Sequence, residues 1–431
     1  MSRREFLKRA GIGSGAVVVA AAVGTTWRAV DQGVFATGEG AAYQAWAAWD
    51  ARTGPPLLPL VRAAVLAANA HNTQPWFFAL GANRIDLFVD PARNIGAMDP
   101  LRREMYISLG CALENLTLAA WANGFDPNVA LLPTAGDITH VARVSLAPVV
   151  AVASPLYRAI PQRHTDRGAY DAARPLAAAT LGGLAALNTH PDLELVWLTT
   201  PAAMGQFAAL TLQATAAIIA DPEQARDDFV WWRGDWQAIQ AHKDGITLDP
   251  AGLPALTRAL GKILPAQALP AYDQAWLDGM RTRQVGTAAA FGLLVARDGG
   301  DNAQRLAAGQ FWQRLHLSAT TQGLAMQPLC QIAERIDREQ ATGGRIGHHT
   351  RLRGYVADTP QPGGDGVPHR LPHGGRTPQP APPRRGGSTP LNSTYSVSEV
   401  LHSRSPATGD HDCGANSAES GERAAISTRI A

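Results

Sequence analysis

Hydrogen-bonding side chains are concentrated in a seven-residue stretch, Ala70-His71-Asn72-Thr73-Gln74-Pro75-Trp76. It follows an apolar helical run at 57–69 and precedes a strand-like run at 84–90. Pro75 prevents the helix from continuing, and its ring favours an extended backbone at Gln74. Two interpretations are open: a helix-ending loop with a packed tryptophan, or a stiff segment that presents polar groups to a planar ligand. In the second interpretation the presenting residues are His71, Asn72, Thr73 and Gln74.

A second stretch gathers positive charge. Residues 158–167 hold three arginines and one histidine directly before a helical segment at 176–187. Guanidinium groups suit phosphate because their planar fork binds two oxygens at once. The alternative is a solvated loop whose arginines form salt bridges and bind no ligand. The candidates for phosphate binding are Arg163 and Arg167.

Two predicted helices and a strand must position these stretches. Residues 99–104 open a long helix with apolar residues at three- and four-residue spacing, and Gly124 lies where its C-cap belongs. Residues 301–323 form a second amphipathic helix, which closes at Gly323-Leu324-Ala325. A strand is expected at 141–146, where the pattern alternates. The sequence therefore predicts a mixed helix and strand protein.

The motif His-Asn-Thr-Gln-Pro-Trp at 71–76 resembles the flavin-contacting loop of nitroreductase-type FMN proteins, and most closely that of the Acg family of FMN-binding oxidoreductases. Residues 110–115, Gly-Cys-Ala-Leu-Glu-Asn, are similar to part of the family's long central helix, and 311–325 resemble its late helix. The segment 158–167 resembles its Arg-x-Ser-x-Arg-like opening. Its arginine spacing departs from the pattern, because His164-Thr165-Asp166 separates the last two arginines.

The resemblance implies FMN as the cofactor; no metal site is expected, because the cysteines are widely spaced and lack a CxxC pair. Asn72 and Gln74 are expected to face the isoalloxazine or ribityl region, and two arginines the phosphate. No catalytic side chain is implied, because the flavin performs the hydride chemistry itself. The full set of expected cofactor-binding residues is His71, Asn72, Thr73, Gln74, Arg163, Arg167, Gly323 and Leu324.

The resemblance also implies an α+β, nitroreductase-like fold built from two fused halves, 40–157 and 158–340. Each half is expected to contain an antiparallel sheet with flanking helices, and the halves to form a pseudo-dimer with the flavin at their interface. Residues 226–250 are a Trp-rich insertion whose spacing wraps most of one helix. Its tryptophans are either packing residues or a lid over the flavin.

The N-terminus carries a targeting signal. Ser2-Arg3-Arg4-Glu5-Phe6-Leu7-Lys8 precedes an apolar run of small residues at 10–24, which is shorter than the roughly 20 residues of a membrane span. This pattern is typical of twin-arginine (Tat) export; the alternative is a basic start followed by a buried helix. Residues 1–36 are expected to engage the Tat machinery and direct the chain to the periplasm or cell envelope, as a cleaved signal or a membrane anchor.

Composition excludes several classes of function. The chain of 431 residues has a net charge of +2, so no bulk field points to nucleic acid. Its three cysteines lack the CxxC spacing of a zinc site and form no disulfide framework. No G-x-G-x-x-G motif supports a separate nucleotide domain, and no G-x-S-x-G motif supports an exported hydrolase.

The C-terminal segment, 341–431, has a different composition. Pro, Gly, Ser, His and Arg dominate, and no helix or strand is predicted, so the segment reads as a disordered tail. A frameshift is the second explanation: the resemblance implies a final strand Phe-Arg-Ile-Gly-Tyr-Pro, which the codons of residues 367–373 can spell one base later. The nucleotide sequence of the gene distinguishes the two explanations. If the shifted frame does not encode that hexapeptide, the frameshift is excluded.

Two functions follow from these observations. The first is an exported FMN-dependent oxidoreductase that reduces small organic acceptors, such as nitro compounds or quinones, with NAD(P)H as the expected electron donor. The second is a non-catalytic protein that binds or sequesters flavin beneath the Trp-rich lid. The sequence alone leaves both open.

Overall fold

The computed structural model describes residues 26–171, 174–343 and 347, and the backbone of 395–403. The twin-arginine motif, its apolar run and the 367–373 segment lie outside the described residues. Within them the chain is a mixed α+β protein with two four-stranded antiparallel sheets and many helices. The predicted fold class is confirmed at this level.

The first sheet has the strand order β1-β2-β4-β3. The predicted strands at 84–90 and 141–146 are confirmed as β2 and β4. The other two were not predicted, because β1 buries only its first residue and β3 is an edge strand that contains Pro127. The strands are β1 (Trp76–Leu80), β2 (Arg84–Val89), β3 (Phe125–Leu131) and β4 (His140–Pro148).

The second sheet has the strand order β5-β6-β8-β7. Its third position is filled by residues 395–403, which pair with both neighbours. The prediction that no element follows residue 341 was therefore wrong for this segment, whose short strand lies within a stretch of low-complexity composition. The strands are β5 (Leu193–Leu198), β6 (Ala290–Ala296), β7 (Leu324–Leu329) and β8 (Tyr395–Ser403).

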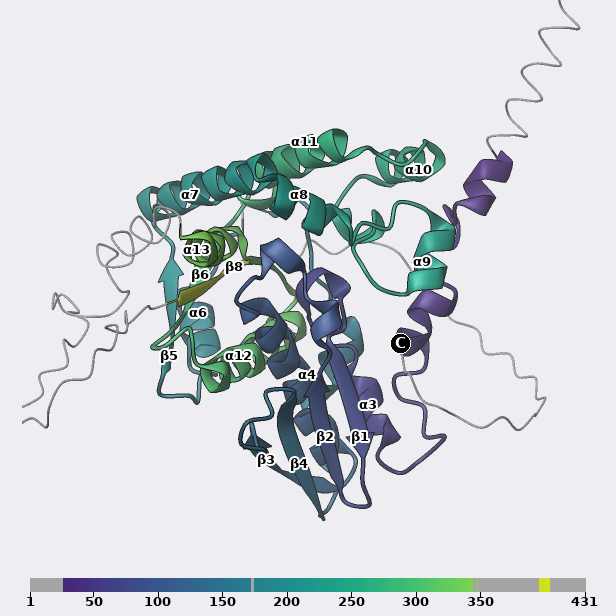
Figure 1. The fold of residues 1–431 in the computed structure, drawn as a ribbon, viewed down its shortest axis with the longest axis vertical. Helices are drawn as coiled ribbons and strands as arrows, with labels where there is room; N and C mark the ends of the chain where they lie inside the picture. The colour runs from purple at the N-terminus through teal and green to yellow at the C-terminus, as the bar shows by residue number, and fades with distance from the viewer. Residues whose placement is uncertain (1–25, 172–173, 344–346, 348–394, 404–431) are drawn as a thin grey trace, which may run out of the picture.

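The two sheets share one topology. In each, two strands are followed by a 20-residue helix and then by two more strands, and the spatial order is first, second, fourth, third. The helices are α4 (Arg103–Ala122) and α12 (Asn302–Thr321), which confirm the two long helices predicted from the sequence. Figure 1 shows both between the two sheets.

Helices α4 and α12 touch backbone to backbone at two glycines. A Cβ added to Gly110 would lie 2.1 Å from the carbonyl oxygen of Leu306, and one added to Gly309 would lie 2.0 Å from that of Ile107. Both glycines occupy the eighth position of their helix. The predicted role of the small residues at 110–112, close approach of neighbouring backbones, is confirmed at Gly110.

Polar groups one turn after the glycine in each helix hold the same crossing. Gln313 Nε2 donates to Asn115 Oδ1 at 2.9 Å, and Asn115 in turn donates to the carbonyl of Ala63. Arg314 donates to both carboxylate oxygens of Glu114, at 2.8 and 3.1 Å. Bonds of this kind fix the rotation of one helix against the other.

A layer of helices covers the second sheet (Figure 1). Helix α7 is long and apolar enough to cross a membrane, but a core helix passes the same test, and Phe207 on α7 packs on Phe291 of β6.

The insertion at 226–250 was predicted as one helix and forms parts of two, broken around Gly234. The elements that matter for the site are α3 (Leu58–Ala64), α7 (Pro201–Ala220), α8 (Pro222–Phe229), α9 (Trp236–His242), α11 (Leu269–Gly279), η7 (Met280–Gln284) and α13 (Gln331–Thr342).

The helix crossing leads to a stability prediction. Gly110→Ala places a methyl group inside the contact distance of the facing carbonyl, so we expect it to lower the free energy of unfolding by about 3 kcal/mol, the upper end for overpacking. Gly205→Ala is the matched control: it lies inside α7 with nothing within 4 Å of the added carbon, and should stabilise by about 0.5–1 kcal/mol. Urea unfolding of both variants tests this; equal effects would contradict it.

Candidate functional site

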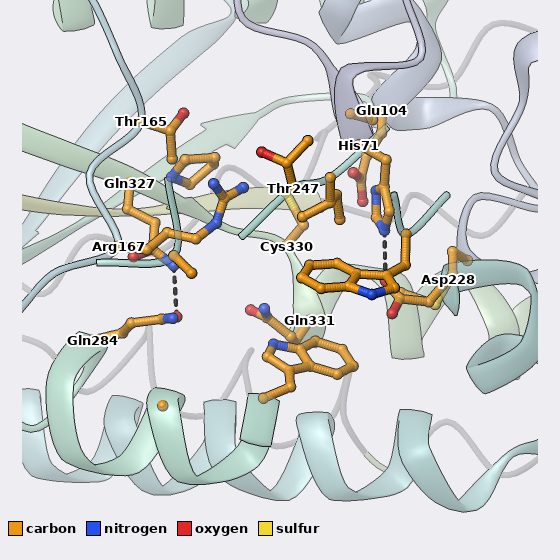
Figure 2. A pocket seen from close by; sticks show the side chains of 18 of the residues that line it. His71, Glu104, Thr165, Arg167, Asp228, Thr247, Gln284, Gln327, Cys330 and Gln331 are labelled. Atoms are coloured by element: carbon orange, nitrogen blue, oxygen red, sulfur yellow. Dashed lines mark hydrogen bonds and ion pairs between the residues drawn. The ribbon is translucent and has the colours of Figure 1, made fainter. Parts of the chain in front are cut away.

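A cavity of ≈ 290 Å³ lies between the two sheet-and-helix units. The first unit contributes the loop around His71 and the N-terminal half of α4. The second contributes α8, α11, η7, β7 and the start of α13. Its size is at the lower end of ligand-binding pockets. Figure 2 shows that its labelled side chains converge on a central space.

The loop at 70–76 carries unusual backbone conformations. His71, Asn72 and Gln74 all have positive φ, at 49°, 53° and 53°. The predicted extended backbone at Gln74 was therefore wrong: its N–H is held by Asn69 Oδ1 at 2.8 Å, and these local bonds outweigh the preference set by Pro75. Such conformations cost on the order of 1–3 kcal/mol each and concentrate at functional sites.

His71 forms the strongest polar contact of the cavity wall. Its Nε2 lies 2.6 Å from Asp228 Oδ1 on α8, and both residues line the cavity (Figure 2). Burial opposes protonation of the imidazole, but the hydrogen bond and charge of Asp228, with a smaller contribution from Glu104, outweigh it and raise the pKa of His71 above 6.5. The pair therefore joins two segments 157 residues apart by a charged contact.

The opposite side of the cavity carries amides and guanidinium groups. Figure 2 shows Thr165, Arg167, Gln284 and Gln327 together, away from His71. Gln327 Nε2 donates to Gln284 Oε1 at 2.7 Å, which fixes both amides. Burial lowers the pKa of Arg167, because removing the charged guanidinium group from water costs free energy. A bound anion would offset that cost.

Residues from a π-helical turn complete this side. Element η7 supplies Arg283 and Gln284 to the cavity lining. Turns of this kind are rare and often occur at functional sites. Arg283 Nε is buried without a hydrogen-bond partner, so it is available to a bound ligand.

Aromatic rings form the apolar walls. Trp232 and Tyr272 lie with ring centroids 5.2 Å apart, and Trp276 and Trp312 also line the cavity. Trp232 Nε1 and Gln331 Oε1 are buried on the lining without a hydrogen-bond partner. Flat walls with unsatisfied polar atoms at their edges suit a planar, hydrogen-bonding ligand.

The structure brings only part of the predicted site together. His71 and Arg167 line the cavity. Asn72 is exposed, and Gln74 Nε2 donates to the carbonyl of Lys243 at 2.7 Å. The remaining predicted residues, also off the cavity lining, are Thr73, Arg163, Gly323 and Leu324.

Two of these residues have clear structural surroundings. Arg163 is 5% exposed, donates to the carbonyl of Leu66 at 3.2 Å, and burial lowers its pKa to about 10. Gly323 follows the C-terminal end of α12 with φ of 68° and has nothing within 4 Å of an added Cβ. Neither residue is among those that line the cavity.

The Trp-rich insertion is attached to the 70–76 loop by its backbone. Gly245 N–H donates to the carbonyl of Asn72 at 3.3 Å, and the Gln74 amide binds the carbonyl of Lys243. Arg93 Nη1 donates to both the carbonyl of Thr73 and Asp244, at 2.7 and 3.3 Å. With the His71–Asp228 contact, these bonds form a clamp between the loop and the insertion.

Several lining residues were not predicted from the sequence. Asp228, Arg283, Gln284 and Gln327 come from segments whose local pattern is an ordinary helix or strand. Glu104 was read as part of a structural helix start. Only the dense charge around Asp228, in Arg226-Asp227-Asp228, marked one of these segments. The others are brought together by tertiary packing.

Comparison with curated proteins identifies the chain as a distant homologue of nitroreductase-like proteins. It is 29% identical over 290 residues to "Putative NAD(P)H nitroreductase Rv3131" of Mycobacterium tuberculosis, covering 66% of this chain and 78% of that protein. It is 32% identical over 88 residues to "Putative NAD(P)H nitroreductase acg" of the same organism, covering 20% of this chain and 27% of that protein. No family model matches.

The His71–Asp228 contact gives a prediction about pH. Because the pKa of His71 is raised, the charged pair stabilises the fold fully below the ordinary histidine pKa, and this contribution is lost as pH rises through the raised value. Asp228→Asn removes the negative charge that favours the protonated imidazole but leaves the imidazole buried, so the pKa of His71 should fall. NMR titration of the imidazole, assigned with His71→Gln, measures it. Asp227→Asn is the control; an equal effect there would contradict the assignment.

Proposed function

We propose that the chain is an FMN-binding oxidoreductase of the nitroreductase type. The observation that carries the proposal is the cavity between the two units, where His71 of the nitroreductase-like loop faces Arg167 of the arginine segment across aromatic walls. These two segments are the ones whose sequence resembles flavin-contacting segments. The distant homology to putative NAD(P)H nitroreductases supports the same class.

The residues present fit the chemistry of FMN. The ligand needs a cation for its phosphate, donors and acceptors for its ring edge, and flat apolar surfaces for its ring faces. Arg167 and Arg283 supply the cations; Gln284, Gln327 and Gln331 supply the amides. The unpartnered Arg283 Nε and Gln331 Oε1 are the atoms that such a ligand would satisfy.

In this proposal the protein holds and orients the flavin, and the flavin, when bound, supplies the hydride transfer. Arg167 and Arg283 hold the phosphate, and the Gln284–Gln327 pair lies beside Arg167 at the same end of the ligand. Trp232 excludes water from one wall. His71 is proposed to be the loop residue nearest the ligand. The other residues expected from the sequence are proposed to support the structure around the cavity: Asn72, Thr73, Gln74, Arg163, Gly323 and Leu324.

The repeated topology supports a pseudo-dimer. We propose that residues 40–157 and 158–340 are fused copies of one nitroreductase-like unit, with α4 and α12 in equivalent positions and with β8 (Tyr395–Ser403) completing the sheet of the second copy. The shared strand order and the glycine at the eighth position of both helices support it. A cavity between two such copies is where a flavin shared by two subunits would lie.

We also propose export through the Tat pathway to the periplasm or cell envelope. The support is the N-terminal sequence alone. The proposed electron donor is NAD(P)H, because the relatives are named as putative NAD(P)H nitroreductases, and the proposed acceptors are nitro compounds or quinones. Fusing residues 1–36 to a reporter that matures only after folded export tests the first proposal.

A second function is favoured by the clamp. Three direct contacts and a bridge through Arg93 join the insertion to the 70–76 loop, and Trp232 of the insertion lines the cavity. A protein whose lid stays closed would store flavin and exclude substrates. The second proposal is therefore a flavin-sequestering protein.

The phosphate role leads to a binding prediction. Arg167→Gln removes a charged hydrogen bond worth about 1.5–3 kcal/mol, so FMN should bind about 10- to 100-fold more weakly. Arg158→Gln, an exposed arginine of the same segment, should bind like the wild type. Quenching of FMN fluorescence gives both dissociation constants. Equal affinities would contradict the assignment of Arg167.

The two functions predict different behaviour of the purified protein. Both expect a flavin absorbance spectrum and release of FMN on denaturation. Anaerobic addition of NAD(P)H should bleach the flavin band of an enzyme and leave that of a storage protein unchanged. A colourless protein that takes up no added FMN would contradict both.

A further inference from the structure

Two carboxyl groups line the cavity next to the His71–Asp228 pair. Glu104 comes from the first turn of α4 and Glu334 from the first turn of α13, and they are 6% and 4% exposed. Their side chains are within hydrogen-bonding contact of each other. Two carboxyl groups can share such a contact only when one of them carries a proton.

The surroundings favour retention of that proton. Arg103 Nη2 lies 3.5 Å from Glu104 Oε1, but the same guanidinium donates to Asp337 at 2.8 Å. Asp99 lies at the same helix start, where it accepts from the N–H groups of Glu104 and Met105.

Acidic groups therefore outnumber basic groups among the neighbours of Glu334. The groups that face it are Glu104 and Arg103 on α4 and Asp228 on α8. Burial, and then Glu104, raise the pKa of Glu334 well above its usual range, while Arg103 only partly opposes them. Burial and Glu104 also raise the pKa of Asp99 to about 7. Glu334 and Asp99 therefore keep their protons to higher pH than ordinary carboxyl groups do.

A second buried glutamate shows what a purely structural arrangement looks like. Glu114 is 1% exposed, and Arg314 donates to both of its oxygens. Glu334 Oε2, by contrast, is buried on the cavity lining without a hydrogen-bond partner. Its open oxygen points to an interaction with something that enters the cavity.

We propose that the Glu104–Glu334 pair donates a proton to the acceptor reduced in this cavity. This inference rests on the proposed function and adds to it the acid that the sequence did not reveal. Glu104 lies on the His71 side of the cavity, opposite Arg167 (Figure 2), so a ligand held at its anionic end by Arg167 has its other end toward this acid.

The step balances for a quinone. A bound flavin, reduced beforehand by the proposed donor NAD(P)H, would supply a hydride, that is, one hydrogen and two electrons, and an oxyanion would remain on the quinone. The proton of the carboxyl pair would then bond to that oxygen and give a neutral hydroquinone. The pair is left as two carboxylates, and it recovers its proton from water.

Infrared spectroscopy and kinetics of the full chain test the proposal with Glu334→Gln. The difference spectrum between the wild type and Glu334→Gln should show a carboxylic acid C=O stretch at neutral pH that shifts in D2O, because the subtraction removes the band of other protonated carboxyl groups such as Asp99. With the flavin-loaded protein, quinone reduction should be about 100-fold slower in this variant at unchanged KM, which is within the contribution of a general acid. Glu339→Gln, on the same helix and off the cavity lining, is the control and should match the wild type in both measurements.

The pH profile separates a donor from a structural acid. The wild-type rate should fall as pH rises through deprotonation of the pair, and the Glu334→Gln rate should be independent of pH over the same range. Absence of the infrared band, or a variant with the wild-type pH profile, overturns the donor role while leaving flavin binding intact. A protein that takes up no FMN overturns the proposed function itself, and with it the donor role, whether or not the band is present.

Discussion

The contact between Gly110 and Gly309 is the constraint on which the rest of the structure depends. It brings the backbones of α4 and α12 within a distance that no Cβ permits. The hydrogen bonds beside it extend the same constraint outward, because Gln313 binds both Asn115 and the N–H of Ala68. The helix crossing thus reaches the segment that leads into the cavity.

The cavity follows from that crossing. Ser108 on α4 accepts from the N–H of Ala70 at 3.0 Å, so the strained loop is fixed to the same helix that crosses α12. Trp312 reaches the cavity from α12 itself. A shift of one helix along the other would move His71 relative to Arg167, and the two sides of the cavity would no longer face each other. Rigid elements of this kind hold a site better than free loops.

The sequence was informative where function depends on local pattern. The two long helices and strands β2 and β4 followed from periodicity, and the His71 loop and the Arg167 segment from their residue types. Edge strands were missed because β1 and β3 bury few residues and β3 contains a proline. Strand β8 was missed because its surroundings have the composition of a tail.

Site residues contributed by ordinary elements could not be predicted in this way. Gln284 faces Gln327 only because η7 and β7 pack together, 43 residues apart in sequence. Strands β3 to β7 separate Glu104 from Glu334 in chain order, and each alone is a favourable acidic residue in the first turn of a helix. Their significance appears only when both reach one cavity.

The polarity of the cavity bears on the choice between turnover and storage. A storage site needs only contacts that hold flavin, such as the arginine and amide side. Burying Glu104, Asp228 and Glu334 on the other side costs folding free energy and repels an anionic ligand. That cost is easier to explain if the acids act on a second molecule, beside the flavin, than if the cavity holds flavin alone. The clamp then has to open for that molecule, and its His71–Asp228 contact, the one charged link among the clamp bonds that lines the cavity, is weakened as pH rises. Access of the second molecule to the cavity and the supply of its proton would thus depend on neighbouring groups of the same cavity wall.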